Sequence, residues 1–473
     1  MMNNVSGIIK ASMLFSATLL LSTTSAFSQA VVTDISSALW QKLPKGYDLS
    51  NCGFIPKQDA KNVWWACELY QGSEERTRPV PAFVWVLPID NSGNLGSGLL
   101  GDSVGMNNHP WISILAFGTK NSLLAMDDRD QPVIAALEIP RYSVNQPVKL
   151  PVLWQYLPNN QQEKLSVTKA IATDNGGYAF LLEDFSDAAG EQEQDSFTVV
   201  QVTDQGQERW QYHYAKALPA GTKLKDYFDE NGLIKNIFIT HDQKIIIYMI
   251  IYGDGYQEAD FPGTFLLCLN AEGKEISNQF FNSMYWDKSV DWAEHGFGFV
   301  NYAGLETDDE TNQTTHPYIT LFNKNCQKTA DLRLHFPSHT ASRETYEEIK
   351  ATVVAPNGNL WVVYTQKELP KDYFADNDQA EPLLPSLYLA EFNQQGEAVQ
   401  DIGLMTGQDK NRDYLQFFVD GEGGVDTIKT TLAILPQTNE VLISVHNMGV
   451  TSETGDEELQ ANPYPRLYRV KLP

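Results

Sequence analysis

The sequence predicts an all-β fold made of seven consecutive repeats, each of four antiparallel strands. Short segments rich in Val, Phe, Tyr and Trp alternate with polar turns, as expected for strands. The turns use Asp, Asn and Gly, which tolerate positive φ. The order strand, tight turn, strand, long loop, strand, tight turn, strand returns about every fifty residues along the chain.

The first three repeats show this order with different clarity. The first, approximately residues 51–103, contains NCGFIPKQDAKNVWWACELY followed by AFVWVLPIDNSGNLGSGLL. The second, approximately 110–156, fits less well because its loop is short and its last turn is irregular. The third, approximately 165–215, is the clearest, with SVTKAIATDNGGYAFLLEDF and then SFTVVQVTDQGQERWQYHY.

Four further repeats follow, at approximately 233–282, 288–335, 346–405 and 425–473. The last of them stops after its third strand. The segment 31–43 (VVTDISSALWQKL) could supply the missing outer strand and so close a ring of repeats, which would leave no sheet edge exposed. A short helix also fits SSALWQKL, so both structures remain open for this segment.

The turns between third and fourth strands share one form, seen in PIDNSGN, VTDQGQE, LNAEGKE, FNKNCQK and FNQQGEA. Repeats of four antiparallel strands with this regularity resemble the β-propeller superfold, here with seven blades. A large β-sandwich or two stacked β domains is the alternative. No WD, Kelch or quinoprotein signature is present, so the resemblance names no family within the superfold.

Residues 1–30 predict a secretory signal peptide. Lys10 is their only charge, ASMLFSATLLL is a short apolar core, and Ser28 and Ala30 stand at small-residue cleavage positions. Cleavage near Ala30 would leave residues 31–473 as a single soluble domain in a periplasm or outside the cell. No other segment is apolar enough to insert into a membrane.

The cysteines agree with an oxidising compartment. If KQDAK forms a hairpin turn, Cys52 and Cys67 lie opposite each other, near enough for a disulfide. Cys268 falls in an apolar strand and Cys326 in a turn. They could be two free thiols or a second bridge.

The net charge is −26, from 60 acids and 34 bases, which disfavours binding to nucleic acid or to an anionic membrane. In a propeller, all loops from second to third strands leave the same face. These loops together hold 25 acids and 5 bases, a net of −20, and six of the seven are negative. They span residues 71–80, 127–131, 185–195, 253–263, 303–316, 366–385 and 447–463. An acidic loop face for a basic partner is therefore predicted, although exposed loops are also acidic for solubility alone.

The same loops hold the candidate ligand-binding residues. Calcium is the one cofactor that the sequence suggests. The carboxylates that could bind it are Asp254, Glu258, Asp260, Asp308 and Asp309, and their spacing does not match an EF-hand. Aromatic side chains suited to a saccharide or a basic peptide are Tyr256, Phe261, Tyr373 and Phe374.

No nucleophile elbow, P-loop or dinucleotide fingerprint appears in the sequence. His335 and His339 are close together, but Pro337 between them prevents a helical zinc motif. The sequence therefore predicts a monomeric binding or interaction module that uses its acidic face. The alternative is a carbohydrate-active or other hydrolytic enzyme with two carboxylates in the central funnel.

Overall fold

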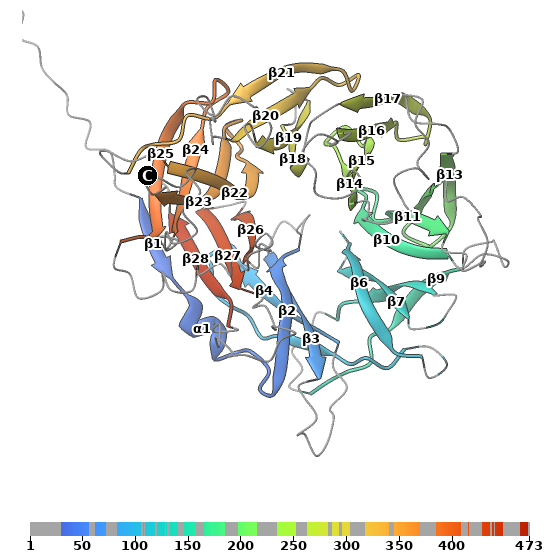
Figure 1. Cartoon of the computed structure of the whole chain (residues 1–473). Helices are drawn as coiled ribbons and strands as arrows, with labels where there is room; N and C mark the ends of the chain where they lie inside the picture. Colours follow the sequence, from blue (N-terminus) through green and yellow to red (C-terminus); the bar gives the residue numbers. More distant parts are fainter. Residues whose placement is uncertain are drawn as a thin grey trace, which may run out of the picture.

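The chain folds into seven four-stranded antiparallel sheets arranged in a ring (Figure 1). The computed structural model describes residues 30–55, 62–71, 83–105, 107, 109–118, 121–127, 129, 133–140, 146–157, 165–184, 197–214, 234–251, 263–281, 286–292, 296–302, 317–339, 345–368, 385–407, 415, 428–435, 438, 440–447 and 464–471. Among these residues, no helix has the length and apolar character needed to cross a bilayer.

Each sheet is one blade, and in six of the seven sheets the four strands follow one another in chain order. Blade 1 holds β2 (Tyr47–Phe54), β3 (Asn62–Gln71), β4 (Val84–Asp90) and β5 (Leu99–Gly101). Blade 2 holds β6 (Trp111–Phe117), β7 (Ser122–Asp127), β8 (Ile134–Glu138) and β9 (Val152–Tyr156). Blade 3 holds β10 (Leu165–Ala172), β11 (Tyr178–Asp184), β12 (Phe197–Val202) and β13 (Glu208–Tyr214).

Blade 4 holds β14 (Ile234–Ile239), β15 (Ile245–Ile251), β16 (Gly263–Leu269) and β17 (Glu275–Phe281). Blade 5 holds β18 (Trp286–Asp291), β19 (Phe297–Tyr302), β20 (Pro317–Phe322) and β21 (Lys328–Arg333). Blade 6 holds β22 (Thr345–Val354), β23 (Leu360–Glu368), β24 (Ser386–Phe392) and β25 (Ala398–Met405). Blade 7 holds β26 (Ile428–Leu435), β27 (Glu440–Asn447), β28 (Arg466–Lys471) and, from the other end of the chain, β1 (Val31–Asp34).

The seventh blade is completed by β1, which pairs with β28 from Val31 opposite Lys471 to Asp34 opposite Tyr468. The short helix α1 (Ser36–Trp40) follows directly. The segment 31–43 thus contains both of the structures that its sequence fits. Ser36 Oγ accepts a hydrogen bond from Leu467 N at 2.9 Å, and Trp40 Nε1 donates to Pro465 O at 2.7 Å. These two bonds fasten the helix to the last strand, and the ring closes without a free outer strand in blade 7.

The first sheet begins at Tyr47, a few residues before the predicted start of the first repeat. The cause is a bulge at Asn51 and Cys52, beyond which Tyr47 to Ser50 continue to pair with β3. A pattern of alternating residues does not cross such a bulge, so the sequence showed only the part of β2 that follows it.

The tight turns explain why the sequence repeats its polar residues. In the turn of blade 4, Asn270 O accepts a hydrogen bond from Gly273 N at 3.0 Å. The side-chain oxygen of Asn270 also accepts from the backbone N of Glu272 at 3.1 Å and of Lys274 at 2.8 Å. Gly273 has φ of +74°, a conformation that costs a side-chain-bearing residue about 1–2 kcal/mol. Most of these turns therefore begin with Asn, Asp or Thr and have Gly three residues later, although Gln243 and Cys326 take the positive-φ position in two of them.

Seven hydrophobic clusters fill the seven junctions between neighbouring blades. Between blades 4 and 5, for example, Tyr248 packs on Phe299 with ring centroids 4.8 Å apart, and Phe238 packs edge-on against Phe297 at 5.6 Å. The core therefore lies between sheets and runs around the ring, which makes the protein an all-β, seven-bladed β-propeller.

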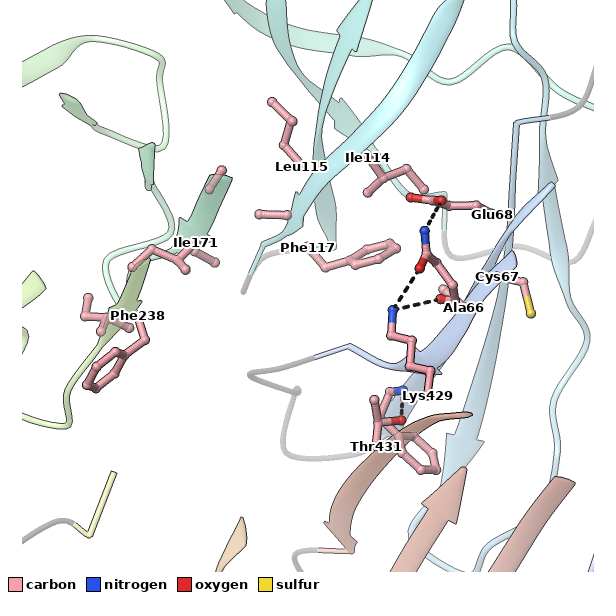
Figure 2. A pocket seen from close by; sticks show the side chains of 17 residues that line it. Ala66, Cys67, Glu68, Ile114, Leu115, Phe117, Ile171, Phe238, Lys429 and Thr431 are labelled. Carbon is pink, nitrogen blue, oxygen red and sulfur yellow. Dashed lines mark hydrogen bonds between the residues drawn. The ribbon is translucent and has the colours of Figure 1, made fainter. Parts of the chain in front are cut away.

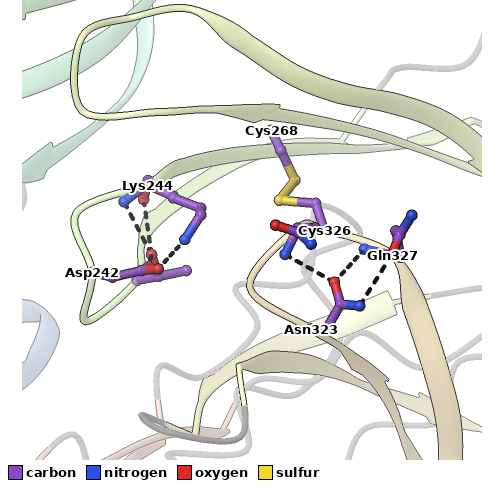
Figure 3. A network of polar contacts seen from close by, with 8 residues as sticks. Asp242, Lys244, Cys268, Asn323, Cys326 and Gln327 are labelled. Atoms are coloured by element: carbon purple, nitrogen blue, oxygen red, sulfur yellow. Dashed lines mark hydrogen bonds and ion pairs between the residues drawn. A yellow bond between two sulfur atoms is a disulfide. The ribbon is translucent and has the colours of Figure 1, made fainter.

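Two disulfides are present. Cys52 and Cys67 join β2 to β3 with Cα atoms 4.1 Å apart, which confirms the predicted bridge. Cys268 in β16 pairs with Cys326 in the last turn of blade 5, which settles the question that the sequence left open (Figure 3). The first bridge lies within one blade, whereas the second ties two neighbouring blades together.

Candidate functional site

A pocket of about 570 Å³ lies at the centre of the ring. It is lined by residues of β2, β6, β10, β14 and β26, which are the first strands of blades 1, 2, 3, 4 and 7, and by three residues of β3. The first strand of each blade is the one nearest the axis (Figure 1). The pocket is therefore part of the central channel, where small-molecule sites of propellers and other closed β folds can form.

Most of the pocket wall is apolar. β6 contributes Ile114 to Phe117, β10 contributes Ala170 to Ala172, and β14 contributes Phe238 and Ile239. Each of these groups includes the final residue of its strand. The apolar wall therefore lies toward the end of the channel where the turns between first and second strands are found. Figure 2 shows Phe117, Ile171 and Phe238 around this cavity.

The polar part of the wall is a cluster of Lys429, Asn51 and Glu68 (Figure 2). Lys429 Nζ lies 3.4 Å from both the backbone O and the side-chain Oδ1 of Asn51. Asn51 Nδ2 donates to Glu68 Oε2 at 2.5 Å. Asn51 therefore connects the lysine of blade 7 to the carboxylate of blade 1. Its φ of +49°, adopted in the bulge of β2, is a conformation that Asn tolerates better than most residues.

Burial disfavours the charged form of Lys429 and lowers the pKa of its ammonium group below the ordinary value. The negative charge of Glu68 opposes this effect, and the positive charge of Lys169 on β10 adds to it. The pocket thus holds a partly desolvated ammonium group with a second cation nearby.

A second cluster of ionisable groups lies where blade 5 meets blade 6. His339 Nε2 lies 2.7 Å from Asp401 Oδ2, and Tyr364 donates to Asp401 Oδ1 at 3.1 Å. The His339 ring stacks on Tyr388 with centroids 3.9 Å apart. Burial raises the pKa of the Asp401 carboxyl, although His339 and Tyr364 act in the opposite direction. These contacts fasten the segment that leaves blade 5 onto the outer strands of blade 6.

The raised pKa of Asp401 predicts a pH-dependent stability. A carboxyl that binds its proton more tightly in the folded state stabilises the protein most at low pH, and this contribution is lost as the pH rises through the raised pKa. Asp401→Asn should therefore gain in free energy of unfolding, relative to the wild type, as the pH rises from about 4. Urea unfolding of both proteins between pH 3.5 and 6 measures this. If the free energies of unfolding of the two proteins differed by the same amount at every pH, the expectation would be contradicted.

All predicted ligand-binding residues fall outside the described part of the chain. They are Asp254, Glu258, Asp260, Asp308, Asp309, Tyr256, Phe261, Tyr373 and Phe374. Within the described ranges, no group of three or more His, Cys, Asp or Glu side chains could hold a metal ion. His335 and His339 contact different carboxylates, Glu397 and Asp401.

The channel residues Lys429, Asn51 and Glu68 were not predicted from sequence. A signal for the lysine was present, because the first strands of blades 3 to 7 each contain one: Lys169, Lys235, Lys288, Lys350 and Lys429. In a chain with so many more acids than bases, cations that recur on the strands nearest the axis are a pattern that repeat alignment could have revealed. The contact with Asn51 and Glu68 depends on ring closure and has no local signal.

No family model and no curated protein matches the chain. Solved structures of propellers are similar to it over most of its length. The Cps50 (Swd1) β-propeller domain of Myceliophteria thermophila is 10% identical, with 94% of this chain and 100% of that chain covered and a TM-score of 0.41. YCF48 from Cyanidioschyzon merolae is 9% identical, with 93% and 98% covered and a TM-score of 0.42. A protein of unknown function from Dyadobacter fermentans is 11% identical, with 94% and 99% covered and a TM-score of 0.40. These similarities are too distant to bear on function.

Proposed function

We propose that this protein is a binding module, secreted or periplasmic, that docks a basic protein or peptide on an acidic loop face. The observation that carries the proposal is the concentration of charge in the loops between second and third strands, which hold 25 acids and 5 bases. The sheet order supports it, because the second strand runs in the same direction in every blade and these loops therefore leave the ring on the same side. Such a potential attracts cationic partners and repels nucleic acid.

The location rests on the predicted signal peptide in residues 1–30 and is supported by two disulfides, which persist in oxidising compartments. A monomer is part of the proposal. Tyr256, Phe261, Tyr373 and Phe374 would add apolar contacts to a peptide, or stack on a saccharide. Calcium, where it binds, would use loop carboxylates such as Asp254, Glu258, Asp260, Asp308 and Asp309. No resident cofactor is required.

The hydrolytic alternative needs two carboxylates about 5–10 Å apart in the funnel. Of the described residues that line the channel pocket, Glu68 is the single acid. Its side chain accepts a hydrogen bond from Asn51. No observation on the described residues therefore favours hydrolysis over binding.

Neutralising one acidic loop is expected to weaken association with a polycation. In the triple variant Asp308→Asn, Asp309→Asn and Glu310→Gln, binding to poly-L-lysine at about 50 mM salt should fall several-fold, because three nearby charges are removed from the contact surface. Adding Asp456→Asn, Glu457→Gln and Glu458→Gln should reduce it further. Surface plasmon resonance across a salt series measures the loss and the salt slope.

The matched control removes three acids from tight turns on the opposite side of the ring, with Asp174→Asn, Asp204→Asn and Glu272→Gln. Net charge changes by the same amount, so a general charge effect would lower binding equally in both variants. Equal retention of the loop variant and the control variant on poly-L-lysine would show that the loop face is not the docking surface.

A further inference from the structure

We propose that the channel pocket binds a small amphiphilic anion, with the carboxylate of the ligand on Lys429 and its apolar body against the walls formed by β6, β10 and β14. This site is separate from the acidic loop face, and the inference does not depend on that face having a partner.

The ammonium group of Lys429 has hydrogen-bonding capacity to spare. It carries three donors, and both of its contacts with Asn51 are 3.4 Å long, beyond the usual 2.7–3.2 Å range of N–H···O bonds. Removing a cation from water without strong partners is unfavourable. An anionic ligand oxygen would supply the short, charge-assisted bond that the protein does not provide.

The local charge favours an anion over a cation. The positive charge of Lys169 is close enough to affect the ammonium group of Lys429. Among the described residues that line the pocket, Glu68 is the single carboxylate. Glu68 is also engaged by the amide of Asn51 at 2.5 Å, which leaves less of its charge available to a ligand. A positive spot inside a protein of net charge −26 is not explained by bulk composition.

The rest of the pocket selects an apolar body. Phe117, Ile171, Phe238 and Ile114 line the cavity (Figure 2). A volume of about 570 Å³ falls within the range of small-molecule sites, which are mostly apolar with a few polar groups that fix the ligand's orientation. A strongly hydrated anion such as inorganic phosphate would leave this wall without a partner, so a monocarboxylate with a hydrocarbon or aromatic body fits better.

The charged and apolar parts of the wall are separated along the channel. Phe117, Ala172 and Ile239 are the last residues of β6, β10 and β14, whereas Lys429 is the second residue of β26 and stands toward the other end of its strand. A ligand with a charged group at one end and an apolar body at the other matches this arrangement.

The test compares decanoate with decanol, which share the apolar chain and differ in the charged group. Isothermal titration calorimetry on the full mature chain, below the concentrations at which either probe aggregates, should show decanoate binding with one site per chain. Lys429→Met should weaken decanoate by about tenfold or more, because a charge-assisted bond is lost, and leave decanol within about twofold. The affinity of the wild type for decanoate should also fall as the pH rises and the lysine loses its proton.

Two further variants make the outcome decisive. Lys274→Met removes an exposed lysine from a tight turn of blade 4 and should leave decanoate binding unchanged. Glu68→Gln removes the opposing carboxylate and should tighten decanoate by about threefold; it serves as the deciding variant should Lys429→Met fail to fold. The proposal is wrong if decanoate does not bind the wild type, if Lys429→Met and Lys274→Met bind it equally, or if Glu68→Gln weakens it.

Discussion

Gly273→Ala is expected to lower the free energy of unfolding by about 2–5 kcal/mol. Gly273 has φ of +74°, and a Cβ placed on it would lie 2.3 Å from Cδ2 of Trp210 in the neighbouring blade. The Trp210 ring is held there, since its Nε1 donates to Ala271 O at 3.0 Å. The new methyl group would therefore force blades 3 and 4 apart. Chemical unfolding followed by tryptophan fluorescence measures the loss.

Gly407 supplies the control, because its φ is +60° and a Cβ there would meet nothing within 4 Å. Gly407→Ala should cost only the backbone strain, about 1 kcal/mol. Trp210→Ala should also relieve the clash, so that Gly273→Ala costs about 1–2 kcal/mol in that background. Equal losses for the two glycine variants would show that the ring of Trp210 does not constrain the turn.

The disulfide between Cys268 and Cys326 gives the second large prediction. Cys326→Gly in a Cys268→Ala background should lower the free energy of unfolding by about 2–4 kcal/mol, because the bridge closes a sequence separation of 58 residues. Cys326→Ala in the same background should lower the free energy of unfolding by about 1 kcal/mol more than Cys326→Gly does. The difference arises because Cys326 has φ of +59° at the position that Gly273 and Gly396 occupy in the equivalent turns. Urea unfolding of the three proteins, without reductant, measures both effects.

The two substitutions remove the same bond, so each is the control for the other. If both variants are equally stable, the left-handed conformation at residue 326 carries no cost. If neither is less stable than the wild type, the bridge does not constrain the unfolded chain. In a reducing buffer the two variants should keep their order, because the backbone effect does not depend on the disulfide.

Much of the ring could be predicted because its determinants are local. A turn such as Asn270 to Gly273 needs only four residues, and the same turn joins the third and fourth strands of blades 1, 3, 5 and 6. The bridge between Cys52 and Cys67 was predictable for the same reason, since the two residues lie in one hairpin. Strand and turn signals therefore fixed the number of blades and the order of strands without any knowledge of how the blades meet.

What could not be predicted depends on contacts between blades. Cys268 and Cys326 lie in different blades, although the alignment of turns does place Cys326 where a glycine is usual. The channel pocket combines strands of blades 1, 2, 3, 4 and 7, so Lys429 meets Asn51 only in the closed ring. The pattern of residues within a single strand cannot predict a contact between two different blades.

The pairing of β1 with β28 also dictates when this protein can finish folding. Val31 pairs with Lys471, some 440 residues further along the chain. A ribosome makes the first of these partners long before the second, so the strand at residues 31–34 must wait, unpaired, through the synthesis of six other blades. Individual hairpins can form early, but the last blade and the junctions beside it form only after Lys471 has emerged. The ring of blades can therefore close only after residues 31–471 have all been synthesised.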